Sequence, residues 1–337
     1  MKKLITLLLA FMLLFSMSLF TACNPEQPTS SVTLVGLQNG TYVTPSADYD
    51  YFVVPEPAAS TKVSATAGKL SIAGSLQDLY GNGTGYPQAV LVAKKSVIES
   101  NGAKVKQLIN SFTENVNWLN ADTTTSQTIV NAVTSAFIDQ ETVPTFTAQN
   151  LNKTVIANCG ISYSDAQTSK QKVLSYLSKV NQVGENAFGT PVDGFFYNGE
   201  CTDQTGGTLS LYCPDGAPAL SVARLIDDKT IVEGLDVKVV PATTIQTYVA
   251  GANPTADLCI MPVNAASKIL GNANNYQMLG VVTNGNLFIL KKENGQNITK
   301  QNASTVLNNK KIGVINLANV PGLTLKAILK DLGIQFA

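Results

Sequence analysis

Several polar residues directly follow short apolar runs, a position where they can hydrogen-bond to a bound molecule. Asp215, Asn264 and Glu56 each come after a run typical of a buried strand. Their carboxylate and amide groups can bind a ligand, or they can cap the helix that begins beside them. In open α/β sheets, ligands bind beyond the carboxyl ends of the strands. Further candidates at such strand ends and Gly/Pro loops are Gly216, Thr283, Asn284, Asn319, Gly322, Thr324, Tyr86 and Gln88.

The residues that usually carry catalysis are scarce. The chain has no His, which excludes Ser-His-Asp and Cys-His nucleophile systems and His general bases. Its one Arg, Arg224, is the only side chain that could clamp an anion in bidentate fashion, unless it is simply a solvated helix residue. We therefore expect binding rather than an enzyme, with no cofactor.

Aromatic residues offer a surface on which a planar ligand could stack. Tyr86, Tyr212 and Tyr248 are the candidates, whereas Trp118 lies beside an apolar helix face and is expected to pack. With so little Arg, we expect a neutral or weakly charged planar heterocycle rather than an inorganic anion or a sulfonate.

The cysteines do not indicate a metal site or a disulfide framework. Beyond Cys23 they are Cys159, Cys201, Cys213 and Cys259, and none forms a CxxC pair. Cys213 and Cys259 lie in apolar runs, so we expect buried thiols there.

Composition indicates a globular protein with substantial cores. Hydrophobic residues make up 45% and charged residues 14%, and Lys+Arg 23 balances Asp+Glu 23. Such a neutral chain gives no reason to expect nucleic-acid binding. The length suffices for two lobes of ordinary size, and we expect a monomer.

Strand-like and helix-like segments alternate, which predicts an α/β fold. Nearly continuous apolar runs favour strands buried in mostly parallel sheets. The predicted strands are Val32–Leu37, Tyr51–Val54, Leu70–Ala73, Ala89–Lys94, Leu209–Cys213, Val237–Val240, Leu258–Met261, Leu279–Val282, Leu287–Lys291 and Lys311–Ile315. A 3.6-residue period predicts helices over 105–119, 129–137, 173–180 and 325–332.

Two of these strands look alike, because both end in a pair of lysines. They are the segments 89–94 and 286–291. A two-lobed binding protein needs two chain crossings between its lobes, and we predict that these are the crossing strands. The alternative is two unrelated edge strands.

The first 23 residues resemble an export signal. Lys2 and Lys3 precede an apolar run from Leu4 to Phe20, and small residues lead to Cys23. This resembles a bacterial lipoprotein signal in which Cys23 becomes the lipidated mature N-terminus. The alternative is an uncleaved transmembrane anchor, for which the run is short. Either way we expect an extracytoplasmic protein held at the cell membrane, with 24–31 as a polar tether.

Five stretches together resemble one family, the solute-binding lipoproteins of ABC importers in the nitrate/sulfonate/thiamine-pyrimidine-like group. They are Tyr212–Leu220 (YCPDGAPAL), Ala256–Ala266 (ADLCIMPVNAA), Met278–Asn286 (MLGVVTNGN), Lys311–Gly322 (KIGVINLANVPG) and Tyr51–Ala59 (YFVVPEPAA). The resemblance implies a two-lobed periplasmic-binding-protein-like fold of type II, a small-molecule ligand and an ABC permease as partner.

The order of the segments differs from that family. The part at about 205–337 comes first there, and the part at about 30–197 follows, so the chain resembles a circular permutation. We predict one lobe from 32–88 plus 304–337 and another from 89–197 plus 205–303. The former termini would be joined at 198–204. Val32–Leu37 should then lie beside Lys311–Ile315.

Two other functions fit the same chain. One is an enzyme on the same fold, similar to the futalosine-pathway menaquinone enzymes, although those are cytoplasmic. The other is a lipid-anchored adhesion or scaffolding module, which would not need two crossings and a row of loops at strand ends.

Overall fold

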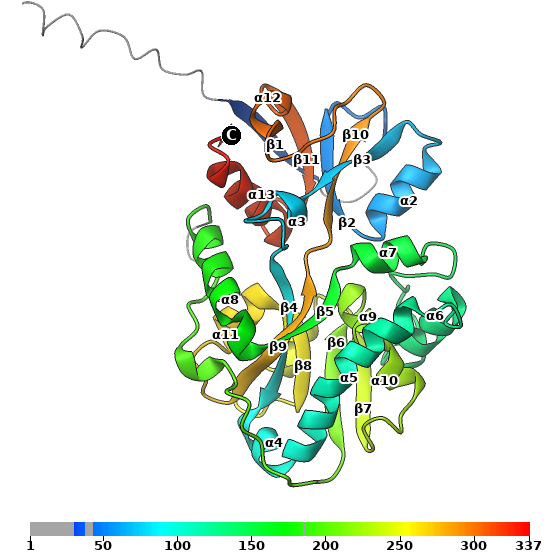
Figure 1. Ribbon diagram of the computed structural model, residues 1–337, viewed down its shortest axis with the longest axis vertical. Helices are drawn as coiled ribbons and strands as arrows, with labels where there is room; N and C mark the ends of the chain where they lie inside the picture. The colour runs from blue at the N-terminus through cyan, green and yellow to red at the C-terminus, as the bar shows by residue number, and fades with distance from the viewer. Residues whose placement is uncertain (1–29, 38–42, 185–186) are drawn as a thin grey trace, which may run out of the picture.

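The computed structural model describes residues 30–37, 43–184 and 187–337. They form two lobes, each built on a six-stranded sheet flanked by helices (Figure 1). The predicted signal, Cys23 and most of the predicted tether lie outside the described residues.

Lobe A contains the sheet with strand order β12-β1-β11-β2-β10-β3. Strands β1, β11 and β2 are parallel, and β10 runs antiparallel to both β2 and β3. The strands are β1 (Ser31–Leu37), β2 (Tyr51–Pro55), β3 (Leu70–Ser75), β10 (Leu287–Lys292), β11 (Lys310–Ile315) and β12 (Gln335–Phe336). The helices are α2 (Ala58–Ala65), α3 (Leu76–Leu79), α12 (Ala303–Val306) and α13 (Val320–Asp331).

Lobe B contains the sheet with strand order β5-β9-β4-β8-β6-β7. The strands are β4 (Pro87–Lys94), β5 (Ile161–Asp165), β6 (Leu209–Pro214), β7 (Leu235–Val240), β8 (Leu258–Pro262) and β9 (Tyr276–Asn284). The α-helices are α4 (Lys95–Ser100), α5 (Gly102–Asn120), α6 (Ser126–Ser135), α7 (Lys153–Asn158), α8 (Ala166–Asn181), α9 (Ala217–Leu220), α10 (Ala223–Asp227) and α11 (Val263–Ile269). Two 3₁₀ turns, η2 (Asp193–Phe195) and η3 (Ile245–Tyr248), complete this lobe.

Both sheets contain the same five-strand pattern. It reads β1-β11-β2-β10-β3 in lobe A and β7-β6-β8-β4-β9 in lobe B, with the fourth strand antiparallel in each. In lobe B the second strand of the pattern, β6, leads through α9 and α10 to the first strand, β7. In lobe A the second strand, β11, leads through α13 to β12, and the first strand, β1, is the first element of the described residues.

The ends of the described chain are neighbours in lobe A, as the permuted order requires. Val32–Leu37 pairs in parallel with Lys310–Ile315, which confirms the prediction that Val32–Leu37 lies beside Lys311–Ile315. On the other side of β1 lies β12, and the Leu34 N–H donates to the carbonyl of Ala337 at 2.8 Å.

The chain passes between the lobes at two places that lie side by side. One crossing precedes Pro87 and the other follows Asn284, and these two residues are opposite each other in the β4–β9 ladder. The prediction that the segments 89–94 and 286–291 themselves cross between the lobes is therefore wrong. β4 lies within lobe B and β10 within lobe A, each just after a crossing.

The prediction that the second lobe extends to residue 303 is also wrong. Residues 287–303 belong to lobe A, because β10 inserts antiparallel between β2 and β3. Each crossing thus leads into a strand that is antiparallel to both of its neighbours: β4 in lobe B and β10 in lobe A.

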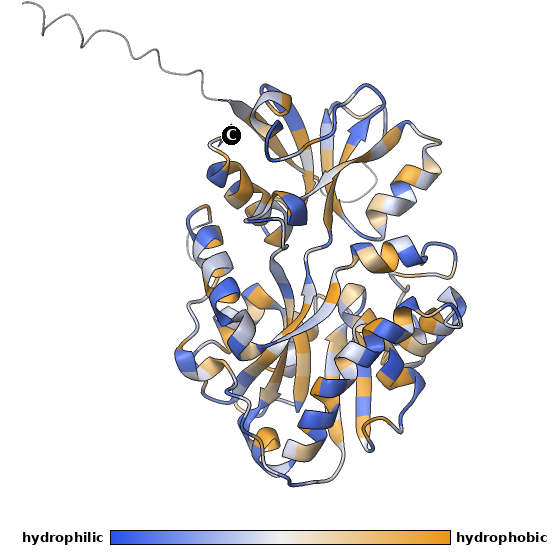
Figure 2. Cartoon of the chain, viewed as in Figure 1, coloured by the Kyte–Doolittle hydropathy of each residue, from blue (hydrophilic) through white to orange (hydrophobic). Residues whose placement is uncertain are grey.

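Hydrophobic residues concentrate along the strands and the inward faces of the helices (Figure 2). Strands such as β2 and β8 are buried along nearly their whole length, as continuous apolar runs require. Cys159, Cys213 and Cys259 are buried free thiols, and Cys201 is a half-buried one. Among residues 30–37, 43–184 and 187–337, no helix combines the length and hydropathy needed to cross a bilayer.

Candidate functional site

Glu56 lies where β2 ends, at the boundary between the lobes, and its side chain is only 4% exposed. Its Oε1 accepts hydrogen bonds from Ser60 Oγ at 2.7 Å and from Asn158 Nδ2 at 2.7 Å. Its Oε2 accepts from the Ser60 N–H at 3.1 Å. Asn158 ends α7, which lies in lobe B (Figure 1). The Glu56 carboxylate therefore accepts from the first turn of α2 in its own lobe and from lobe B, and so joins the two lobes.

The same hydrogen-bond network continues into both crossings. The Glu56 N–H donates to the carbonyl of Asn286 at 3.1 Å, and Asn286 Oδ1 accepts from Gln88 Nε2 at 2.7 Å. Gln88 Oε1 is buried and has no hydrogen-bond partner among the described residues. We call Glu56, Gln88, Asn158 and Asn286 the junction cluster.

Asn264 extends this polar region along lobe B. It lies in the first turn of α11, just after β8, and its Oδ1 is also buried without a partner among the described residues. The β4–β8 ladder pairs Ala89 with Pro262, so Gln88 and Asn264 both lie just beyond the same end of that ladder. Two amide oxygens without donors thus occur at one end of the sheet.

Three other predicted site residues already make hydrogen bonds around the crossings. Thr283 is fully buried and its Oγ1 accepts from the Ala89 N–H at 3.1 Å, where the β4–β9 register shifts. Asn284 Oδ1 accepts from Lys172 Nζ at 3.1 Å, and Thr324 Oγ1 bonds the Tyr176 hydroxyl at 2.8 Å. Ligand contact by these side chains stays a prediction.

Tyr86 is fully buried beside the crossings. Its ring stacks on Tyr176 with centroids 5.4 Å apart, and its hydroxyl has no partner among the described residues. Burial raises its pKa well above the ordinary value, so the hydroxyl stays protonated.

Asp215 and Gly216 lie after β6 and shape the start of α9. Asp215 Oδ1 accepts from the Gly216 N–H and Oδ2 from the Thr145 N–H, both at 2.7 Å. Gly216 has φ +99°, a conformation that favours glycine. A carboxylate already lies at this helix start, so an anion there would meet its repulsion.

Asn319 and Gly322 lie at the start of α13. Asn319 is exposed and its side chain makes no capping hydrogen bond. Gly322 is buried, and a Cβ there would lie 2.0 Å from the carbonyl oxygen of Leu317. The absence of a side chain at Gly322 thus permits the backbone at Leu317 to approach closely.

The three tyrosines predicted to form a stacking surface for a planar ligand do not lie together. Tyr212 stacks on Tyr248 with ring centroids 4.2 Å apart, and Lys238 Nζ lies 5.2 Å from the Tyr212 ring centroid. Tyr86 stacks on Tyr176 instead, so the three rings belong to two separate aromatic pairs. Arg224 pairs with Glu114 at 2.6 Å on the lobe B helices, and Trp118 packs against the core as expected.

A second contact joins the lobes on the other side of the crossings, where α8 of lobe B meets α13 of lobe A (Figure 1). Lys179 forms an ion pair with Asp331, and the Tyr176–Thr324 hydrogen bond is buried beneath it. The crossings thus lie between two inter-lobe contacts, one made by α8 and α13 and one by Asn158 and Glu56.

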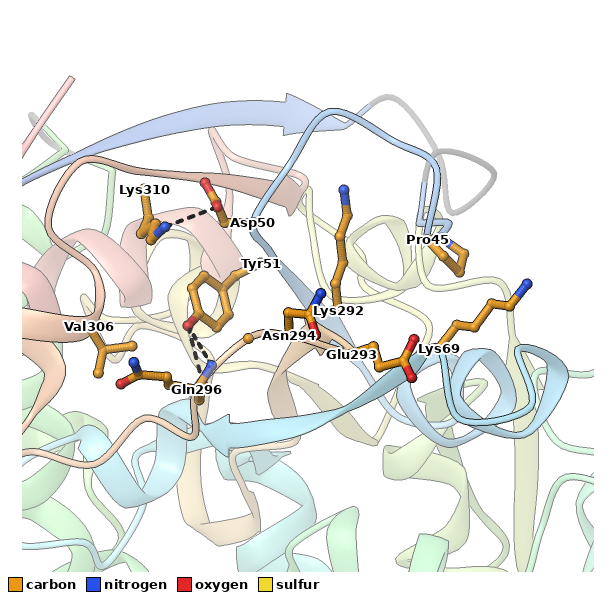
Figure 3. A pocket seen from close by; sticks show the side chains of 11 residues that line it. Pro45, Asp50, Tyr51, Lys69, Lys292, Glu293, Asn294, Gln296, Val306 and Lys310 are labelled. Carbon is orange, nitrogen blue, oxygen red and sulfur yellow. Dashed lines mark hydrogen bonds and ion pairs between the residues drawn. The ribbon is translucent and has the colours of Figure 1, made fainter.

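The structure also contains cavities away from the junction. One of about 450 Å³ lies at the far pole of lobe A, where Lys310 pairs with Asp50 at 3.4 Å and the Tyr51 hydroxyl donates to the carbonyl of Gln296 (Figure 3). Another of about 560 Å³ lies between α5 and α8 in lobe B. The first is formed at the amino ends of β2 and β11, and no predicted ligand residue lines either, so we place the candidate site at the junction.

Asn158 and Asn286 were not predicted as site residues. Asn286 had a weak signal, since it follows Asn284 and Gly285 at a crossing. Asn158 had none, because its partner Glu56 is 102 residues away in sequence. Among the described residues, no group of three His, Cys, Asp or Glu side chains could hold a metal ion.

The strand pattern decides the fold class. The described residues form a two-lobed α/β fold with a six-stranded sheet in each lobe, which is consistent with the predicted periplasmic-binding-protein-like arrangement. No family model matches the chain, and no curated protein matches it. One solved structure that is weakly similar is the oligopeptide-binding protein AppA from Bacillus subtilis in complex with a nonapeptide. The identity is 13%, the match covers 73% of this chain but 52% of that chain, and the TM-score is 0.26.

Proposed function

We propose that this protein binds a small molecule between its two lobes and delivers it to an ABC importer. The observation that carries the proposal is the junction cluster: a partly buried hydrogen bond joins Glu56 of lobe A to Asn158 of lobe B, and Gln88 of the same cluster has a buried amide oxygen with no donor among the described residues. Polar groups from both lobes and both crossings therefore meet at one place, as a molecule enclosed by two lobes requires.

The proposed action is lobe closure. A ligand that contacts both lobes binds the closed arrangement more tightly than the open one and shifts the population toward it. No bond is broken in this cycle, so the lack of His in the sequence is no obstacle. The two adjacent crossings are the segments about which the lobes would move.

We further propose that Cys23 carries a lipid anchor and that the protein works outside the cytoplasm beside a permease. The apolar run and small residues before Cys23 support this proposal. The variant Cys23→Ser should be released into the medium or remain unprocessed. Ordinary membrane retention of that variant would contradict the anchor.

The ligand is proposed to be a small planar heterocycle. Native mass spectrometry of gently purified protein should reveal a bound small molecule. Small-angle scattering of protein stripped of that molecule should show a smaller radius of gyration when the molecule is added back. An unchanged radius at saturating concentration would rule out lobe closure.

A further inference from the structure

The junction contains a buried carboxyl group with no positively charged partner among the described residues. Glu56 is 4% exposed and forms no ion pair with any described residue, although seven other such pairs occur in the structure. A carboxylate provides about four acceptor positions. Ser60 and Asn158 occupy three of them, two on Oε1 and one on Oε2. One position on Oε2 is left.

Two further acceptors lie near the same boundary. Gln88 Oε1 and Asn264 Oδ1 are buried and receive no hydrogen bond among the described residues. The Gln88 side chain is oriented by its bond to Asn286, which leaves this oxygen free. A buried amide oxygen without a donor is unfavourable, so a ligand that supplies donors gains affinity by hydrogen-bonding to it.

The nearby cations and helix ends do not favour an anion. Lys172 Nζ is directed to the carbonyl of Thr84 and to Asn284 Oδ1, and burial lowers its pKa. Arg224 is paired with Glu114, and the start of α9 already holds the carboxylate of Asp215. The junction therefore offers acceptor oxygens that lack donors, and it favours a ligand that supplies N–H groups and a positive charge.

We infer that the junction binds an organic cation that carries N–H donors, a protonated amine or amidine on a small planar body, with its positive group against Glu56. The inference rests on the proposed function and makes its ligand class more specific. The amine or amidine N–H groups supply the donors that Glu56, Gln88 and Asn264 lack. A buried carboxylate recognises a cation more strongly than a neutral isostere, because charge-assisted hydrogen bonds are roughly twice as strong as neutral ones.

Matched probes test this by calorimetric titration of the purified protein. The pairs are benzamidine with benzamide and benzylamine with benzyl alcohol, and the anions are benzoate, methanesulfonate and nitrate. We expect at least one cation to bind about tenfold or more tighter than its neutral partner. A neutral probe or an anion that binds as tightly as the cations overturns the inference, and so does the absence of cation binding at millimolar concentration.

Two variants locate the effect. Glu56→Gln keeps the side-chain shape and should reduce the cation preference about tenfold or more. Because Glu56 also accepts hydrogen bonds from Ser60 in the first turn of α2, Asn264→Asp provides a variant that removes no observed side-chain hydrogen bond. It adds a negative charge and should tighten cation binding while leaving the neutral probes nearly unchanged. An unchanged cation preference in both variants overturns the inference.

Scattering separates this inference from the proposed function. If a neutral or anionic probe binds and reduces the radius of gyration, the solute-binding function stands and the cation inference fails. If cations bind with the expected dependence on Glu56 but the radius does not change, the ligand class stands and closure fails.

Discussion

Gly322 shows how the absence of a side chain permits a close backbone approach at the start of α13. A Cβ at this position would lie 2.0 Å from the carbonyl oxygen of Leu317. Gly322→Ala should therefore lower the free energy of unfolding by about 3 kcal/mol, since the backbone must shift. Gly207→Ala is the control, because no atom lies within 4 Å of its Cβ position. Urea unfolding of both variants measures the difference, and equal stabilities would contradict the argument.

Asp257 provides a residue-scale prediction about pH. Burial raises its pKa, but hydrogen bonds from Ser210 and from Lys94, at 3.2 Å, outweigh burial and hold the pKa below its usual 3.8. A depressed folded-state pKa stabilises the protein above the unfolded pKa, and this stability is lost as pH falls through the folded value. Asp257→Asn should cost about 2 kcal/mol at pH 7 and progressively less below about pH 4.

The matched control for Asp257 is Asp236→Asn. Asp236 pairs with Lys238 at 3.3 Å, but its side chain is 64% exposed. Exposed pairs of this kind contribute about 0–1 kcal/mol, so this variant should show little loss at any pH. Denaturant unfolding from pH 7 to pH 3 compares the two, and a pH-independent loss in Asp257→Asn would show that charge is not the cause.

At the scale of elements, the prediction concerns how α7 holds the lobes together. Gly160, two residues beyond α7, lies against the second crossing, where the Asn284 N–H donates to its carbonyl at 2.8 Å. The backbone just after Asn158 is therefore held by the second crossing, and Asn158 donates to Glu56 from this position. Asn158→Ala removes the inter-lobe hydrogen bond and should increase the mean separation of the lobes. Distance measurements between spin labels on α2 and α6 would detect it.

The control for that experiment is Asn120→Ala. Asn120 Nδ2 donates to the carbonyl of Val116 within the exposed end of α5 and touches neither lobe boundary nor crossing. Its distance distribution should match that of the unmodified protein. If Asn158→Ala gave the same distribution as this control, the lobes would be held by α8 and α13 alone.

At the scale of the whole molecule, the adjacent ends predict that the chain can be reopened elsewhere. The Gln335 N–H donates to the carbonyl of Ser30 at 2.7 Å, so a linker of about five residues can join Ala337 to Ser31. A chain joined in this way and opened between Gly199 and Glu200, at an exposed turn, should fold to the same structure.

Circular dichroism and urea unfolding of the rejoined chain measure this. An opening between Leu91 and Val92 is the control, because it breaks the buried β4 strand that pairs with both β8 and β9. That control should not fold. If the chain opened at Gly199 also failed to fold, segment 198–204 would be an essential structural part rather than a joint.

The residue pattern predicts which segments become strands and which helices pack. Continuous apolar runs such as 51–54 and 258–261 are strands in the structure, and the 3.6-residue period over 105–119 marks the buried face of α5. These features depend on local burial, which a residue pattern records directly. β5 was not predicted, since Ile161–Asp165 is half-buried and mostly polar and forms a strand only by pairing with β9.

Which polar groups meet, and which lack a partner among the described residues, depends on how the elements pack in three dimensions. Glu56 could be identified from its place after a strand, but its bond to Asn158 depends on the packing of two lobes. In the same way, β10 belongs to lobe A because of its antiparallel pairing with β2 and β3. Hydrogen-bond partners far apart in sequence are set by strand pairing and lobe contact, whereas a periodic pattern specifies only which face of each element is buried.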